Sequence, residues 1–256
     1  MHLIDTHTHL FAQQFDDDRT EVVQRAIDSG VQQMLLPNID GSTIQSMMDL
    51  CATFPKNCYP MMGLHPCDVK ENYLEELAVV GEWLEKGGFV AVGEIGIDLY
   101  WDKSTLAIQQ DAFRKQIELA KKHQLPIAIH VRDSFSEVLE IIDELNDETL
   151  AGVFHCFTGT VAQAQHIINY GGFKLGVGGV VTFKNAGVDK TLANISLEHL
   201  ILETDSPYLA PAPHRGKRNE SSYVPLIAQK LADIYGIEVA EVAKITTQNA
   251  QTLFSI

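Results

Sequence analysis

The 256-residue sequence lacks the segments that mark membrane-bound, exported or multi-part chains. No stretch approaches the ~18 uninterrupted apolar residues of a membrane helix. The first five residues contain neither a basic segment nor a long apolar run, so we expect no signal peptide and a cytoplasmic protein. Low-complexity tracts and linkers rich in Pro, Gly and Ser are also absent. This favours one domain over residues 1–256.

Cysteines and basic residues are also scarce. The four cysteines form no CxxC pair and no zinc-finger spacing, which predicts reduced structural thiols. Lys and Arg total 19 against 34 Asp and Glu, and the net charge of −15 argues against a broad surface that coats nucleic acid. A nucleic acid held at a small site is still compatible with this charge, because divalent metals and one local basic cluster could supply positive charge there.

A short apolar run followed by an amphipathic stretch recurs along the whole chain. The apolar runs are rich in Val, Ile and Leu rather than strictly alternating, as expected for parallel strands that are covered on both faces. They are residues 2–6, 31–37, 59–64, 89–95, 127–131, 152–157, 173–178 and 200–204.

The stretches between the apolar runs are predicted to be helices. The clearest are residues 16–29, 105–123, 134–145, 223–235 and 239–253. Gly30 is a candidate C-cap for the first of them, and Ser134 a candidate N-cap for the third. Strict strand–helix alternation predicts an α/β fold with a parallel sheet. Eight such units in a chain of this length are typical of a (β/α)8 TIM barrel, with an open doubly wound sheet as the alternative.

Titratable residues gather where the predicted strands end. In this barrel, active sites lie at the C-terminal ends of the strands. Any single histidine there could be a satisfied core residue, but chance placement explains the whole set poorly. The set consists of His7 and His9 on the first strand, His65 on the third, Glu94 on the fourth, His130 on the fifth, His155 on the sixth and Asp205 on the eighth.

The spacing of these residues indicates a metal site. His7 and His9 are two residues apart, so their side chains point the same way on a strand. Neutral imidazole nitrogens from both could bind one divalent ion. The whole set exceeds the roughly three protein ligands that one catalytic ion needs. It fits two ions, with a carboxylate such as Glu94 placed to bridge them. Because the ligands are nitrogen and oxygen only, several divalent metals are possible.

Six motifs in order resemble those of the TatD-type metal-dependent deoxyribonucleases of the amidohydrolase superfamily, and the resemblance covers the whole chain. The motifs are LIDTHTH at residues 3–9, GLHP at 63–66, GEIGID at 93–98, LPIAIHVR at 125–132, HCFTG at 155–159 and LILETDSP at 200–207.

The resemblance implies a metal-dependent hydrolase barrel with a 3′–5′ exonuclease activity on DNA or RNA ends. It also implies two divalent ions, Mg or Mn first, with Zn, Fe, Co or Ni as alternatives. The implied metal ligands are His7, His9, Glu94, His130, His155 and Asp205.

Asp205 and Glu94 are the candidate catalytic residues. We expect the ions to polarise a phosphate oxygen and to activate a water, and Asp205 to act as the general base. Glu203 could be a further metal contact, although we favour a role in orienting a histidine. The candidate substrate-binding residues are His65, Arg132, Glu203, Arg215, Lys217 and Arg218.

Several of these residues have structural alternatives. His65 could make a merely structural hydrogen bond. Arg132 could pair with a nearby acid such as Asp133 or Glu137 rather than a phosphate, and the basic run 215–218 could be a solvated loop. The aromatic residues at positions 100 and 101 could stack on a terminal base or cover the barrel rim.

Two other functions fit the same residues. The first is a deacylase of aminoacyl-tRNA esters, or another ester or amide hydrolase of the superfamily, since the metal chemistry would be almost the same. The second is a non-catalytic barrel that binds metal tightly without turnover, against which the complete ligand set with Asp205 argues. Nucleic-acid ends are the expected substrate, and no membrane or obligate protein partner is indicated.

Overall fold

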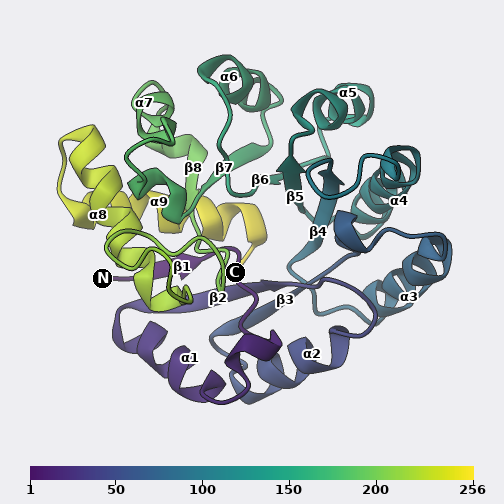
Figure 1. Cartoon of the computed structure of the whole chain (residues 1–256), viewed down its shortest axis with the longest axis horizontal. Helices are drawn as coiled ribbons and strands as arrows, with labels where there is room; N and C mark the ends of the chain where they lie inside the picture. Colours follow the sequence, from purple (N-terminus) through teal and green to yellow (C-terminus); the bar gives the residue numbers. More distant parts are fainter.

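The computed structural model describes all 256 residues and contains one sheet of eight parallel strands in the order β1 to β8 (Figure 1). Backbone hydrogen bonds and an isolated bridge between Thr8 and Ser206 join the region of β1 to that of β8, so the barrel is nearly closed. The predicted (β/α)8 TIM barrel is therefore confirmed. The strands are β1 (Leu3–Asp5), β2 (Val31–Pro37), β3 (Cys58–Met62), β4 (Ala91–Asp98), β5 (Ile127–Arg132), β6 (Gly152–Phe154), β7 (Phe173–Val177) and β8 (Leu200–Leu202).

The helices lie around the outside of the strands (Figure 1). Gly30 follows α1 with a φ of 98°, as expected for a residue that ends a helix. None of the helices is long and apolar enough to cross a membrane. The helices are α1 (Arg19–Asp28), α2 (Ile44–Thr53), α3 (Tyr73–Lys86), α4 (Leu106–His123), α5 (Phe135–Leu145), α6 (Val161–Asn169), α7 (Val188–Leu192), α8 (Val224–Tyr235) and α9 (Val239–Phe254).

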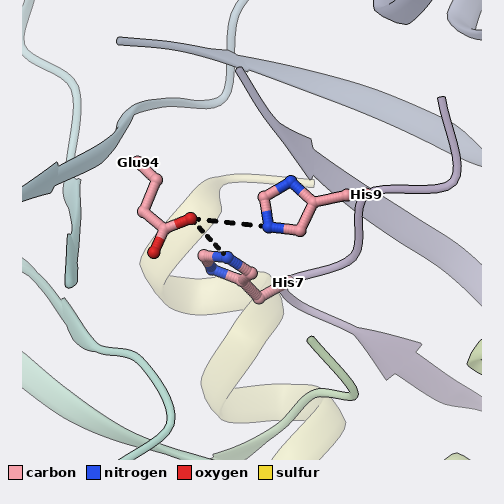
Figure 2. Close-up of side chains that lie close together, drawn as sticks. All are labelled: His7, His9 and Glu94. Atoms are coloured by element: carbon pink, nitrogen blue, oxygen red, sulfur yellow. Dashed lines mark hydrogen bonds and ion pairs between the residues drawn. The ribbon is translucent and has the colours of Figure 1, made fainter. Parts of the chain in front are cut away.

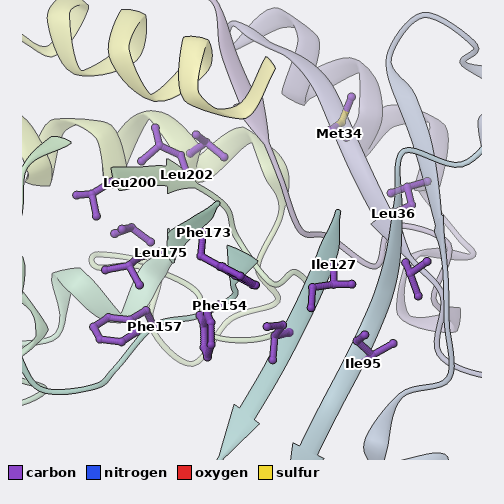
Figure 3. Close-up of a cluster of buried hydrophobic side chains, with 14 of the residues drawn as sticks. Met34, Leu36, Ile95, Ile127, Phe154, Phe157, Phe173, Leu175, Leu200 and Leu202 are labelled. Atoms are coloured by element: carbon purple, nitrogen blue, oxygen red, sulfur yellow. The ribbon is translucent and has the colours of Figure 1, made fainter. Parts of the chain in front are cut away.

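The hydrophobic core has two layers. The larger one lies between the strands and the surrounding helices, and Figure 3 shows part of it. The smaller one takes one side chain from each of seven strands and two from α9. Fully burying an apolar side chain of this size contributes about 1.5–3 kcal/mol, so both layers stabilise the barrel. The smaller layer is Ile4, Leu35, Met61, Ala91, Ala128, Val153, Ile201, Ala250 and Phe254.

Helix α9 covers the end of the barrel where the strands begin. Thr247 of α9 donates a hydrogen bond to the carbonyl of His2, just before β1, and Asn249 donates one to the carbonyl of Leu200, the first residue of β8. The opposite end, where the strands finish, is left for the functional side chains. This is the end at which enzymes of this fold carry their active sites.

Two local predictions were wrong. Strand β4 runs from Ala91 to Asp98 rather than over 89–95, so Glu94 lies inside the strand and not at its end. Ser134 precedes α5 but caps nothing, because its hydroxyl donates to the carbonyl of Ile97 on β4. Gly96 lets β4 and β5 approach closely, since its φ is 141° and a Cβ there would lie 2.1 Å from the carbonyl oxygen of the residue opposite.

Candidate metal centre

Six of the predicted residues converge where the strands finish. His7 and His9 follow β1, Glu94 and His130 lie within β4 and β5, and the other two follow β6 and β8. Their side chains are largely shielded from water: His7 is fully buried, and Glu94 is 2% exposed. Asp205 is the most open of the group, with 15% of its side chain exposed. The barrel thus gathers residues up to 198 positions apart in the sequence around one carboxylate, which is Glu94.

One oxygen of Glu94 faces the two histidines of the first motif. Its Oε2 lies 3.1 Å from His7 Nε2 and 3.5 Å from His9 Nε2, and Figure 2 shows both rings pointing at this carboxylate. Asp205 Oδ1 lies on the same side, 3.5 Å from His9 Nε2 and 3.9 Å from His7 Nε2. Two imidazoles and two carboxylates therefore direct lone-pair atoms at one small volume.

The other oxygen of Glu94 faces a second pair of histidines. Its Oε1 lies 2.7 Å from His130 Nδ1 and 2.8 Å from His155 Nε2. These two ring nitrogens are themselves only 3.3 Å apart. Each oxygen of Glu94 thus faces one pair of imidazoles. The two pairs also touch, since the rings of His7 and His155 are stacked with centroids 3.9 Å apart.

Charge in this cluster is balanced by imidazoles. Burial would raise the pKa of the Glu94 carboxyl group, but the neighbouring His155 and His7 hold it well below its ordinary value. Burial disfavours a charged His9, yet its contacts with Asp205 and Glu94 raise its pKa to about 9. Divalent ions could replace the imidazole protons, because neutral imidazoles and carboxylates are ligands that such ions use. The donor set therefore fits a metal.

Asp98 holds His130 from behind. Its Oδ2 lies 2.9 Å from His130 Nε2, on the side of the ring away from Glu94. Its Oδ1 accepts the backbone N–H groups of Tyr100 and Trp101 at 3.0 and 3.3 Å. Burial tends to raise the pKa of Asp98, but the hydrogen bond with His130 lowers it to about 2, so this carboxylate is charged. A proton on Nε2 leaves Nδ1 of His130 as a lone-pair atom that faces Glu94.

Glu203 holds a corresponding place behind His155. It is fully buried, its Oε1 accepts the backbone N–H of Cys156, and the same oxygen lies 3.5 Å from His155 Nδ1. It is absent from the cavity lining. This placement supports a role in orienting a histidine rather than a contact with substrate.

The geometry of His65 fixes which of its nitrogens carries a proton. Its Nδ1 accepts the backbone N–H of Cys67 at 3.1 Å, so a neutral ring must be protonated at Nε2. That Nε2 lies 3.5 Å from Glu94 Oε1. In this tautomer His65 lines the cavity as a hydrogen-bond donor, and it also lies close enough to Glu94 and His130 to form a further group of candidate metal ligands.

A cavity of about 920 Å³ opens over the carboxylate and histidine cluster, which is large enough for a sizeable ligand. Arg132, Arg215 and Lys217 line it. The chain has six arginines. Four form ion pairs with carboxylates, namely Arg19, Arg25, Arg114 and Arg218. The two arginines without such a pair are therefore the two that line the cavity.

Arg218 is already engaged elsewhere. Its guanidinium forms two hydrogen bonds to Asp18 at 2.8 and 2.6 Å and lies 4.6 Å from the ring centroid of Phe15. It is absent from the cavity lining, unlike Arg215 and Lys217. The basic run that we predicted as one substrate-binding patch is therefore divided by the fold.

Sequence reasoning missed the role of Asp98. The predicted strand ended at residue 95, although Asp98 stands four residues after Glu94 and thus on the same face of a longer strand. This even spacing, together with the GEIGID motif, could have indicated that Asp98 lies on the same face of the strand as Glu94. The pairing of Arg218 with Asp18, 200 residues apart, left no comparable signal.

Comparison with known proteins also indicates a metal-dependent hydrolase. The sequence model of the family described as TatD related DNase matches residues 4–255. The chain is 42% identical over 255 residues to the Bacillus subtilis protein named "Uncharacterized metal-dependent hydrolase YabD", covering 99% of both. It is 33% identical to the Salmonella typhimurium "3'-5' ssDNA/RNA exonuclease TatD", again covering 99% of both. The solved structure of the Escherichia coli TatD homolog YJJV is similar, with a TM-score of 0.93 and 28% identity over 99% of this chain and 98% of that one.

Proposed function

The chain belongs to the TatD-related DNase family of metal-dependent hydrolases, and from this premise we propose that it removes nucleotides from the 3′ ends of single-stranded DNA or RNA. One observation carries the proposal. Glu94 shares its two oxygens between two pairs of histidines at the floor of a cavity that also holds the two unpaired arginines. The Salmonella relative named as such an exonuclease supports the choice of substrate.

We propose that the cluster holds two divalent ions. His7, His9, Asp205 and one oxygen of Glu94 would bind the first, with His130, His155 and the other oxygen of Glu94 binding the second. When bound, such ions polarise phosphoryl oxygens and lower the pKa of water. Glu94 fixes the spacing of the two groups because it is the one carboxylate that both of them contact.

In this proposal Asp205 moves the proton. Burial would raise the pKa of its carboxyl group, but the bond with His9 lowers it, so the group is anionic at neutral pH and can accept a proton. As the water oxygen bonds to phosphorus, its proton passes to Asp205 and the bond from phosphorus to the 3′-oxygen breaks. Asp205 then returns the proton to that 3′-oxygen. The products are a nucleoside 5′-monophosphate and a strand shortened by one residue.

The cavity walls would orient the strand. The guanidinium groups of Arg132 and Arg215 stack on the rings of Tyr100 and Phe183, and their N–H groups suit phosphate oxygens. His65 would donate its Nε2–H to an oxygen of the phosphate that is cleaved. A net charge of −15 confines this attraction to the cavity, because the rest of the surface repels the strand.

The test is cleavage of a 5′-labelled single-stranded DNA oligonucleotide with Mg²⁺ or Mn²⁺. We expect a ladder that shortens from the 3′ end, disappears with EDTA, and slows by about 10²- to 10⁴-fold in Asp205→Asn. The matched control is Asp233→Asn, an exposed aspartate on α8 that is hydrogen-bonded only to Gln229.

Two results would replace the proposal. Release of the amino acid from an aminoacyl-tRNA, with an intact oligonucleotide, would assign a deacylase. Tight metal binding with neither activity would assign a non-catalytic metal-binding barrel.

A further inference from the structure

Two large aromatic side chains are exposed beside the metal centre. Trp101 is 71% exposed and Tyr100 is 55% exposed, on the loop between β4 and α4. Trp101 lines the cavity together with Asp98 and His130. An aromatic side chain that merely covered the barrel rim would be buried against it, and Trp101 is not.

The loop holds this pair in place. Both backbone N–H groups are donated to Asp98, the carboxylate that also contacts His130. The two rings meet edge to face, with centroids 4.9 Å apart and planes at 89°. The position of Trp101 is therefore tied to the candidate metal ligand through a single side chain.

Arg132 completes the arrangement. Its guanidinium carbon lies 3.8 Å from the ring centroid of Tyr100 and 5.5 Å from that of Trp101. It forms no ion pair with Asp133 or Glu137, the acids that follow it in the sequence. A cation placed next to an exposed indole offers a strand two contacts at once, one for a phosphate and one for a base.

We propose that Trp101 and the Tyr100–Arg132 pair form a stacking subsite for one unpaired base of the strand whose phosphate lies at the metal centre. This rests on the function proposed above and adds a requirement for a base. Every base has a π face, so the subsite tolerates all four bases. A base within a duplex is stacked and paired already, so the subsite selects single strands.

The experiment uses the fluorescence of Trp101 itself. The chain has two tryptophans, and Trp83 lies on α3 beneath Lys86, so Trp83→Phe leaves Trp101 as the sole reporter. Oligo-dT and the same oligomer with abasic residues at its 3′ end are titrated into the Mg²⁺-loaded protein that also carries Asp205→Asn, so that the metal centre is filled and the strand is shortened only slowly. Binding is followed in parallel by anisotropy of a 5′ label.

We expect oligo-dT to quench Trp101 and the abasic oligomer to leave it unquenched. Trp101→Ala should weaken binding of oligo-dT by about 5- to 150-fold, while Trp101→Phe restores part of the affinity. The abasic oligomer should bind both proteins alike. An equal loss for both oligomers, or binding without quenching, overturns the subsite.

These results are independent of the exonuclease test. Quenching by a strand that is never shortened would overturn the exonuclease and keep the subsite. Shortening that is equally fast for normal and abasic ends would keep the exonuclease and overturn the subsite.

Discussion

Asp98→Asn should uncouple His130 from the metal while leaving the neighbouring loop intact. Asparagine keeps Oδ1, which accepts the N–H groups of Tyr100 and Trp101. Its amide nitrogen replaces the oxygen that lies 2.9 Å from His130 Nε2. Since the amide donates, Nε2 must become an acceptor, and the ring proton moves to Nδ1. That atom faces Glu94, so a protonated Nδ1 can no longer bind an ion.

The size of the effect follows from the role of Asp98 as a partner of a ligand. Loss of such a partner weakens metal binding about 10- to 100-fold. An ion at 100 times its Kd stabilises the folded protein by about 2.7 kcal/mol, which falls to about 1.4 or 0.4 kcal/mol after those losses. Unfolding 256 residues carries an entropy of about 0.54 kcal/mol/K. The rise in Tm on adding metal should therefore fall from about 5 °C to about 3 °C or 1 °C.

The assay is thermal unfolding of EDTA-stripped protein as Mn²⁺ is added at one fixed concentration. Asp102→Asn is the matched control, because the carboxylate of this exposed aspartate of the same loop accepts hydrogen bonds only from Ser104. Without metal, Asp98→Asn should melt below the wild type, because it loses the charged bond with His130, so the quantity compared is the rise that metal produces in each protein. A metal-induced rise equal to that of the wild type would refute the proposed control of the His130 tautomer.

Three further changes test other parts of the account. Arg215→Ala should weaken single-strand binding for all sequences and lower the slope of log affinity against log salt concentration by about 1. Arg218→Ala should leave that slope unchanged, because the Arg218 guanidinium is already paired with Asp18. Titrations at several salt concentrations measure both slopes. The pKa of His9 near 9 means that metal must displace a proton, so metal affinity should rise with pH up to about pH 9. Calorimetry that shows a pH-independent affinity would contradict this. Burial tends to raise the pKa of Glu220, but the bond to Arg25 lowers it below 4.5. The ionised Glu220 therefore stabilises the folded protein above pH 4.5. This stabilisation is lost as the pH falls through the pKa that Glu220 has in the folded state. Glu220→Gln should therefore be less stable at neutral pH and decline less in acid, and urea unfolding with an unchanged acid decline would speak against it.

Much of the architecture could be predicted because it depends on local patterns of apolar and polar residues in the sequence. Eight apolar runs separated by amphipathic stretches specify parallel strands and helices. The carboxyl ends of such strands meet at one face, so residues such as His7 and His155 could be expected near each other before any contact was known.

The details that failed depend on contacts between distant parts of the chain. Strand β4 continues past residue 95 because β5 pairs with it as far as Asp98 and Arg132, which an apolar pattern cannot register. The hydroxyl of Ser134 leaves its own helix for β4, and Arg218 is taken by an aspartate 200 positions away. The sequence shows that Ser134 can accept or donate a hydrogen bond and that Arg218 can form an ion pair, but it does not show with which residue.

The central claim is that Glu94 joins two metal sites, and anomalous diffraction from crystals of the Mn²⁺-loaded protein tests it most directly. We expect two peaks, each within bonding distance of a different oxygen of Glu94, the first beside His7 and His9 and the second beside His130 and His155. A single peak, or peaks that avoid Glu94, would contradict it.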